Sequence, residues 1–168
     1  MKNKIGILGS GIVARTLGAG FLKHGYEVAM GTRDPGKLAE WHKGDGARAT
    51  IGTFADAARN ADNIVLAVAG HAAESALEMA GLPVLDGKTV IDPTNPLAAE
   101  PPVNGVLKFF TGPNDSLMER LQHKFPTVNF VKAFSSAGNT TMVNPHYKGG
   151  PPTMFICGND DNAKDDVR

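Results

Sequence analysis

A glycine pattern near the N-terminus is the residue spacing with the clearest chemical meaning in this sequence. Gly9, Gly11 and Ala14 form a G-x-G-x-x-A motif between an apolar run at 4–8 and a helical run. In such motifs the first glycine allows a tight turn, the second lets a pyrophosphate approach the backbone, and the small third residue lets the helix lie close to the sheet. N–H groups at the helix N-terminus then face the phosphates. The residues predicted to bind a dinucleotide here are Gly9, Ser10, Gly11, Ile12 and Val13. A glycine-rich turn in another α/β domain is the alternative.

The next apolar run ends in Thr32 and Arg33 rather than in an acidic residue. An acid at this place would bind the ribose 2′-hydroxyl of NAD, whereas an arginine accommodates the 2′-phosphate of NADP. The planar guanidinium of Arg33 matches a phosphate, and Thr32 adds a hydroxyl. The pattern therefore predicts NADP (NADPH) rather than NAD. Asp34 is predicted to cap the next helix, because Pro35 suits a first helical turn.

Two polar residues follow later strand-like runs. Asn95 stands between Thr94 and Pro96, where it could hold a ribose hydroxyl or a carboxamide, or simply form an Asx turn. His71 follows the run 63–68 closely, and it could donate a proton, pack on a cofactor or cap the following helix. Both residues are candidates for the ligand site.

No other group of reactive side chains in the sequence matches a known catalytic or metal-binding pattern. Ser135 and Ser136 follow an apolar run but lack the G-x-S-x-G elbow of many serine hydrolases. The remaining histidines are scattered without metal-ligand spacing, so we predict no metal site. Cys157 lies in the apolar run 153–157, which favours a buried structural thiol over a nucleophile.

Strand and helix patterns alternate along the chain and would bring the candidate residues together. Strand-like runs occupy 4–8, 25–31, 48–51, 63–68, 88–92, 128–134 and 153–157. Gly25 is a candidate residue for ending the first helix, and Thr53 and Ser116 are candidate N-caps. The alternation predicts an α/β fold, namely a Rossmann-type, doubly wound, mostly parallel sheet with helices on both faces. Ligands of such sheets bind beyond the carboxyl ends of the strands. The segments there are Gly9–Val13, Thr32–Arg33, Ala67–His71, Thr94–Leu97 and Ala133–Asn139.

Length and composition limit the class of protein. The 168 residues are enough for one domain, so we expect a single NADP-binding domain over 1–168. Lys and Arg together number 17, as do Asp and Glu, which argues against a nucleic-acid partner. No signal peptide and no apolar run of membrane-spanning length is found, so we expect a cytoplasmic protein without a membrane partner. Homodimer formation is left open.

The chain ends soon after an expected helix start near Gly158. A helix this short is marginal unless it is packed, so we expect a C-terminal segment beyond Arg168; a frayed natural terminus is the alternative.

Several of these segments also carry a resemblance. The sequence resembles the coenzyme F420 (deazaflavin)-dependent NADP oxidoreductase family, which includes the pyrroline-5-carboxylate reductase-like N-terminal NADP-binding domain. The matching pieces are Ile5–Ala14, Gly31–Pro35, Ile64–Ala69, Ile91–Leu97, Val131–Phe134 and Phe155–Asp160. The pieces IDPTNPL and VKAF, in that order, are the more specific ones. The family usually continues VKAF with Asn-Thr, where this chain has Ser135 and Ser136.

The resemblance implies an NADP(H)-dependent oxidoreductase that transfers a hydride between nicotinamide and a flavin-like, deazaflavin or other small-molecule acceptor. It implies a nicotinamide position near Val68, Ala69, Asn95 and Ala137. It assigns no catalytic side chain, and His71 is the one candidate. The alternatives are a non-catalytic NADP(H)-binding or sensing module and an imine reductase of the pyrroline-5-carboxylate reductase type.

Overall fold

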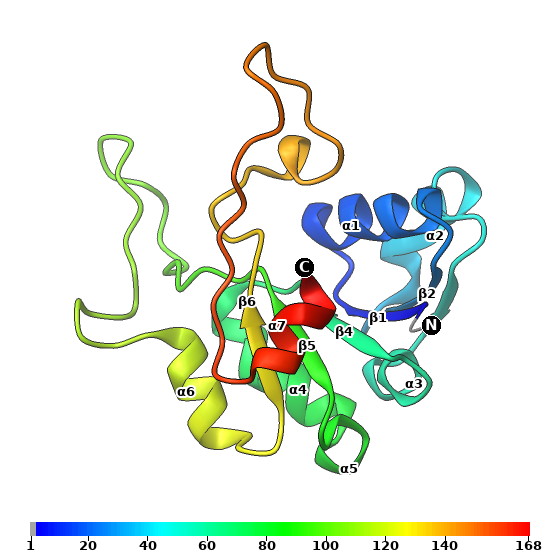
Figure 1. The fold of residues 1–168 in the computed structure, drawn as a ribbon, viewed down its shortest axis with the longest axis horizontal. Helices are drawn as coiled ribbons and strands as arrows, with labels where there is room; N and C mark the ends of the chain where they lie inside the picture. Colours follow the sequence, from blue (N-terminus) through cyan, green and yellow to red (C-terminus); the bar gives the residue numbers. More distant parts are fainter. Residues whose placement is uncertain (1–2) are drawn as a thin grey trace.

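The computed structural model of the protein describes residues 3–168, and it contains one parallel sheet. The described part of the chain forms six strands in the order β3-β2-β1-β4-β5-β6, all paired in parallel (Figure 1). The strands are β1 (Lys4–Leu8), β2 (Glu27–Gly31), β3 (Thr50–Gly52), β4 (Asn63–Leu66), β5 (Thr89–Asp92) and β6 (Asn129–Lys132). The order reverses between β1 and β4, which is the point where open α/β sheets bind ligands. The predicted Rossmann-type fold is confirmed.

Helices cover both faces of the sheet. They are α1 (Ile12–Lys23), α2 (Ala39–Lys43), α3 (Phe54–Arg59), α4 (Ala73–Ala80), α5 (Leu82–Leu85), α6 (Leu117–Lys124) and α7 (Asp161–Val167). Three 3-10 turns, η1 (Pro35–Leu38), η2 (Gly70–Ala72) and η3 (Asn139–Thr141), complete the elements. Alternate residues of β4 enter two separate cores, Ile64 with α3 to α6 and Val65 with α1, because successive strand side chains point to opposite faces.

Local sequence signals set several helix ends as predicted. Thr53 accepts a hydrogen bond from the Asp56 N–H and forms a capping box with it, so α3 begins at Phe54. Ser116 accepts from the Glu119 N–H at the start of α6. Gly25, at φ +86°, ends α1 by donating its N–H to Leu22 O. Asp34, predicted to cap the next helix, caps the 3-10 turn η1, and α2 follows directly.

Glycines along α1 allow close packing on two sides. A Cβ at Gly18 would lie 3.2 Å from Met30 Sδ of β2 and 3.1 Å from the Trp41 ring, so contact with the sheet accounts for a glycine inside the helix. A Cβ at Gly20 would lie 2.6 Å from Val143. This contact holds the segment after β6 against α1.

Lys88, directly before β5, holds the end of α3 at the opposite edge of the sheet from the strand C-termini. Its Nζ donates to Ala58 O at 2.6 Å and to Ala61 O at 2.9 Å. These carbonyls belong to the last turn of α3 and the residues after it, where cations satisfy unpaired acceptors. Burial lowers the pKa of the Lys88 ammonium.

The predicted strand over 153–157 is wrong. Only Cys157 reaches β6, where it exchanges two backbone hydrogen bonds with Lys132 in an isolated antiparallel bridge. Phe155 is 77% exposed and Cys157 is also exposed, so the predicted buried thiol is wrong as well. Apolar, β-prone residues form a strand only where a partner strand meets them along their length. Here only the last residue of the segment, Cys157, meets β6.

Two long segments rise beyond the ends of the strands (Figure 1). The first, 93–116, is tied by hydrogen bonds from Ala98 N–H to Lys108 O and from Phe110 N–H to Pro96 O. The second, 133–160, returns to the sheet at Cys157 and enters α7, which Asp160 caps through the Ala163 N–H. Within residues 3–168, no helix has the length and apolar character needed to span a membrane.

Candidate functional site

Two adjoining hollows lie at the carboxyl ends of the strands. The first, which we call the Arg33 groove, has a volume of about 250 Å³. Its lining includes Gly9, Ser10, Gly11, Thr32, Arg33 and Lys37. The second, the Asn95 groove, has a volume of about 280 Å³, and its lining includes Val13, Gly70, Pro93, Thr94, Asn95 and Leu97. Ala67, Val68, Ala69 and His71 line both grooves, so the segment after β4 joins them.

The glycine turn between β1 and α1 forms one end of the Arg33 groove. Gly9 has φ +143°, and a Cβ there would lie 2.1 Å from the Ala67 carbonyl oxygen. Gly11 differs, because a Cβ there would meet no atom within 4 Å. Gly11 is also the N-cap of α1, and no side chain caps this helix. The first glycine is therefore required by the fold, and the second leaves open space at the positive end of a helix dipole.

Hydroxyl groups join this turn to the end of β2. Thr32 is buried, and its Oγ1 lies 3.2 Å from Ser10 Oγ. The same oxygen accepts a hydrogen bond from the Asp34 N–H at 3.1 Å. This contact fixes the backbone on both sides of Arg33, whose side chain is exposed.

Two cations face the groove without a partner among the described residues. The side chains of Arg33 and Lys37 are both exposed, and neither makes a hydrogen bond or ion pair within residues 3–168. Asp34 also lines this groove, but its carboxylate accepts a hydrogen bond from Gly36 N–H. Sequence reasoning missed Lys37. The pair Asp34-Pro35 could have predicted it, because these residues start a 3-10 turn. That turn brings Lys37 to the same side of the groove as Arg33.

The Asn95 groove is built from the segments that follow β4 and β5, together with Val13 of α1. The Asn95 Nδ2 donates to Ser135 O at 2.9 Å, so its side chain bridges two strand ends and does not form the alternative Asx turn. A Cβ at Gly70 would lie 2.2 Å from Asn95 O, which shows how closely the segment after β4 approaches this turn. Phe134 has φ +62°, a strained conformation for a non-glycine residue. That conformation turns the chain so that Ser135 O faces Asn95.

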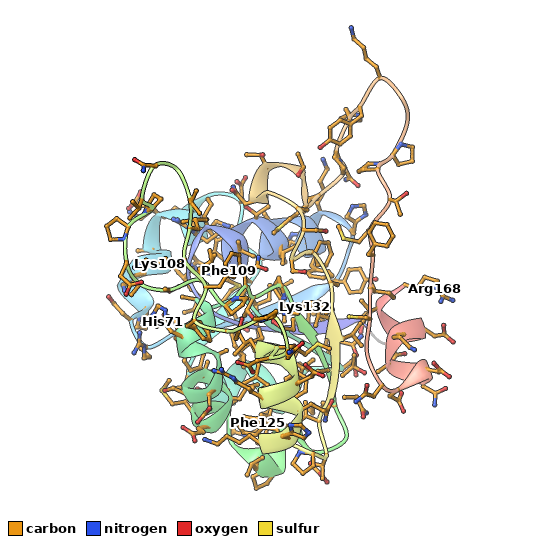
Figure 2. The ribbon with its side chains drawn as sticks, turned by 90° about the vertical axis from the view of Figure 1, so that its left-hand side faces the viewer. His71, Lys108, Phe109, Phe125, Lys132 and Arg168 are labelled. Atoms are coloured by element: carbon orange, nitrogen blue, oxygen red, sulfur yellow. The ribbon has the colours of Figure 1, made fainter. Side chains whose placement is uncertain are left out.

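His71 stands where the two grooves meet. It is exposed, it lies in η2, and it lines both grooves (Figure 2). Its side chain caps no helix, because the N-cap residues of η2 and α4 are Ala69 and Ala72. The position is open to a ligand and to solvent.

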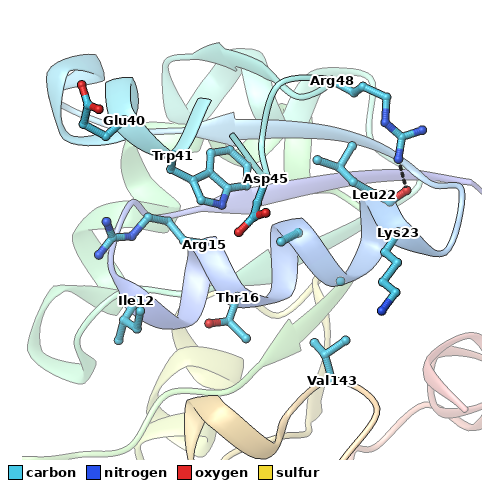
Figure 3. Close-up of a pocket in the computed structure, with 12 residues that line it drawn as sticks. Ile12, Arg15, Thr16, Leu22, Lys23, Glu40, Trp41, Asp45, Arg48 and Val143 are labelled. Atoms are coloured by element: carbon cyan, nitrogen blue, oxygen red, sulfur yellow. Dashed lines mark hydrogen bonds between the residues drawn. The ribbon is translucent and has the colours of Figure 1, made fainter. Parts of the chain in front are cut away.

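Two predicted site residues lie outside both linings. Ile12 is 55% exposed and faces a larger hollow of about 880 Å³ on the outer side of α1, together with Arg15 and Trp41 (Figure 3). Ala137 lies in the turn after β6, where its N–H donates to Phe134 O. Among residues 3–168, no group of three or more His, Cys, Asp or Glu side chains is placed to hold a metal ion.

The chain matches one family model and several solved structures. Residues 4–96 match the family described as NADP oxidoreductase, coenzyme F420-dependent. The crystal structure of a candidate F420-dependent NADP reductase from Arthrobacter sp. FB24 has a TM-score of 0.90 and 33% sequence identity, over 98% of this chain and 77% of that one. The hypothetical protein SMa0349 from Sinorhizobium meliloti has a TM-score of 0.80 and 22% identity, over 98% and 78% of the two chains.

A third structure shares the fold at greater distance. The reductive aminase from Aspergillus terreus in complex with NADPH and ethyl-5-oxohexanoate has a TM-score of 0.64 and 19% identity. The match covers 87% of this chain and 45% of that one.

The two glycines of the turn are expected to respond differently to the same substitution. Gly9→Ala adds a Cβ against the Ala67 carbonyl in a strained conformation, and we expect a loss of about 3 kcal/mol or more of unfolding free energy. Gly11→Ala adds the same group in open space and should cost about 1 kcal/mol or less. Urea unfolding of both variants checks this difference, and equal losses would contradict the assigned roles.

Proposed function

Because the chain belongs to the family of coenzyme F420-dependent NADP oxidoreductases, we propose that it binds NADP(H) along the Arg33 groove and the Asn95 groove. Family membership makes the protein an NADP-dependent oxidoreductase. The observation that carries the proposed position is a pair of unpartnered cations, Arg33 and Lys37, beside the uncapped N-terminus of α1. Since the grooves share the segment 67–71, one extended ligand can lie along both.

The Arg33 groove would hold the phosphates. The open space at Gly11 and the free N–H groups at the start of α1 suit the pyrophosphate. Arg33 and Lys37 would bind the 2′-phosphate, the guanidinium as a planar fork and the ammonium as a point charge. Ser10 and Thr32 are already in contact, so their hydroxyls need little reordering to add polar contacts.

The Asn95 groove would hold the nicotinamide ring. Val13, Val68 and Ala69 offer apolar contact to one part of the ring. Asn95 uses its amide nitrogen on Ser135 O, which leaves Oδ1 to accept from a carboxamide N–H. Ala137 is proposed to contact the ring from the turn after β6, where it lies close to Ser135.

Hydride chemistry is supplied by the nicotinamide when it is bound, so the residues act by positioning. The acceptor is proposed to be a flavin-like or deazaflavin ring or another small molecule, held against the exposed side of the Asn95 groove. Fixing two reactants in a near-attack geometry can contribute roughly 7–11 kcal/mol. A cytoplasmic location and a homodimer stay predictions.

Turnover assays test the proposed reaction. Purified protein is mixed with NADPH and a panel of acceptors, including a deazaflavin, flavins and cyclic imines, and nicotinamide absorbance is followed. We expect NADPH oxidation with at least one acceptor. Tight NADPH binding without turnover on any of them would instead favour a non-catalytic NADP(H)-binding module.

Arg33→Ala should weaken NADPH binding by about ten- to a hundredfold. A hydrogen bond to a charged group contributes roughly 1.5–3 kcal/mol, and about 1.4 kcal/mol corresponds to tenfold in affinity. NADH lacks the 2′-phosphate, so its affinity should hardly change. Lys23→Ala removes a cation of α1 that lines neither groove and serves as the control. Calorimetric titration that gave equal losses for NADPH and NADH would refute the placement of the 2′-phosphate.

His71→Ala should lower turnover by less than tenfold and leave the shape of the pH–rate profile unchanged. The reason is that a ring acceptor can exchange its proton with water at this exposed position. A side-chain proton donor typically contributes about 10²–10⁴-fold. A loss above a hundredfold, with one limb of the profile missing, would make His71 the general acid and favour reduction of an imine.

A further inference from the structure

A buried ion pair lies beside the turn that forms the Asn95 groove. Asp92, the last residue of β5, is fully buried, and Lys132, its neighbour in register on β6, donates to its Oδ2 at 2.6 Å. Asp92 and Lys132 are therefore held together at adjacent strand ends. The Lys132 side chain is 21% exposed, so the pair is largely screened from solvent.

Both members of this pair also hold Thr94. The Asp92 Oδ1 accepts from the Thr94 N–H at 2.8 Å and from its hydroxyl at 2.6 Å. The Lys132 Nζ donates to Thr94 O at 2.8 Å. Every polar atom of Thr94 is thus bound to the pair, and Thr94 lines the groove directly before Asn95.

Stability alone does not account for a charged pair in this place. Removing two charges from water is costly, and well-packed apolar residues of similar volume are often as stable or more stable. The pair does provide something that apolar residues cannot, namely three directed hydrogen bonds to the backbone and hydroxyl of one turn residue. Those bonds fix the turn 93–95 relative to β6, from which Ser135 O reaches Asn95.

We propose that Asp92 and Lys132 are positioning residues for the nicotinamide half of the NADP(H) site. The inference rests on the proposed function, since it assumes that the Asn95 groove takes the nicotinamide. The pair does not reach the other half of the site, because no hydrogen bond within residues 3–168 links Asp92, Thr94 or Lys132 to Ser10 or Thr32. Loss of the pair should therefore affect one half of the ligand and spare the other.

Two ligands distinguish binding at the nicotinamide half of the site from binding at the adenine half. NADPH spans both grooves, whereas adenosine 2′,5′-bisphosphate carries the adenine half and the 2′-phosphate but no nicotinamide. Dissociation constants of both are measured for the wild type and for Lys132→Met. We expect the preference for NADPH over the bisphosphate to fall at least fivefold in the variant, with bisphosphate affinity changed less than twofold.

A matched control addresses stability. Lys88→Met removes a comparable lysine at the other end of β5 from Asp92, whose Nζ holds carbonyls at and after the end of α3. We expect this variant to melt at a lower temperature with an unchanged ligand preference. A similar loss of preference in Lys88→Met would show that any destabilisation produces the effect, and would overturn the inference.

A double variant separates positioning from the cost of an unpaired buried charge. Lys132→Met leaves the Asp92 carboxylate alone, which destabilises the fold, whereas Asp92→Asn combined with Lys132→Met leaves no buried charge. We expect the double variant to regain most of the lost melting temperature but not the NADPH preference. If it regains both, the pair acts only through stability and the inference fails.

The binding measurements distinguish a failure of the NADP(H) site from a failure of the positioning role. If the wild type binds neither NADPH nor the bisphosphate, the proposed function fails and the inference fails with it. If the wild type binds both and Lys132→Met keeps the wild-type preference, the NADP(H) site stands and the positioning role is overturned.

Discussion

The approach of the glycine turn to the end of β4 is the constraint on which the rest of the site depends. Gly9 lies so close to the Ala67 carbonyl that any side chain would collide with it. This contact brings the start of α1 to the place where the strand order reverses. The N–H groups of α1, the end of β2 and the segment after β4 then surround one hollow. A larger residue at position 9 would separate these elements, even with every other residue unchanged.

The two grooves differ in how their polar groups are used. In the Arg33 groove the cations have no partners among the described residues, and the helix start has no side-chain cap. In the Asn95 groove the polar groups are bound to the protein: Thr94 to the buried pair, and the Asn95 amide nitrogen to Ser135 O. The first arrangement suits strong attraction of a charged group, because unpaired charges gain most from a new partner. The second suits the exact placement of a neutral ring, since its groups cannot rotate freely.

The sequence predicted those features that depend on neighbouring residues. The N-cap at Thr53, the end of α1 at Gly25 and the parallel sheet typical of alternating elements all follow from local patterns or general rules of topology. The strand at 153–157 could not be judged locally, because it needed a partner along β6 that only Cys157 meets. The role of Lys132 was equally hidden, since its pairing with Asp92 joins residues 40 positions apart. The position of Lys37 could have been predicted from Asp34-Pro35, which starts a 3-10 turn. The position of Ile12 outside both grooves could not, because it depends on how α1 is rotated against its neighbours.

The contrast between exposed cations and a buried pair has an evolutionary consequence. Arg33 and Lys37 are exposed, so a single mutation at either position can change the proposed contact with the 2′-phosphate without harm to folding, and cofactor preference can change one residue at a time. Asp92 and Lys132 cannot drift in this way, because the loss of either leaves an uncompensated charge inside the protein. They should change together or not at all. Across a lineage, the fold therefore allows positions 33 and 37 to change one at a time, while positions 92 and 132 would covary.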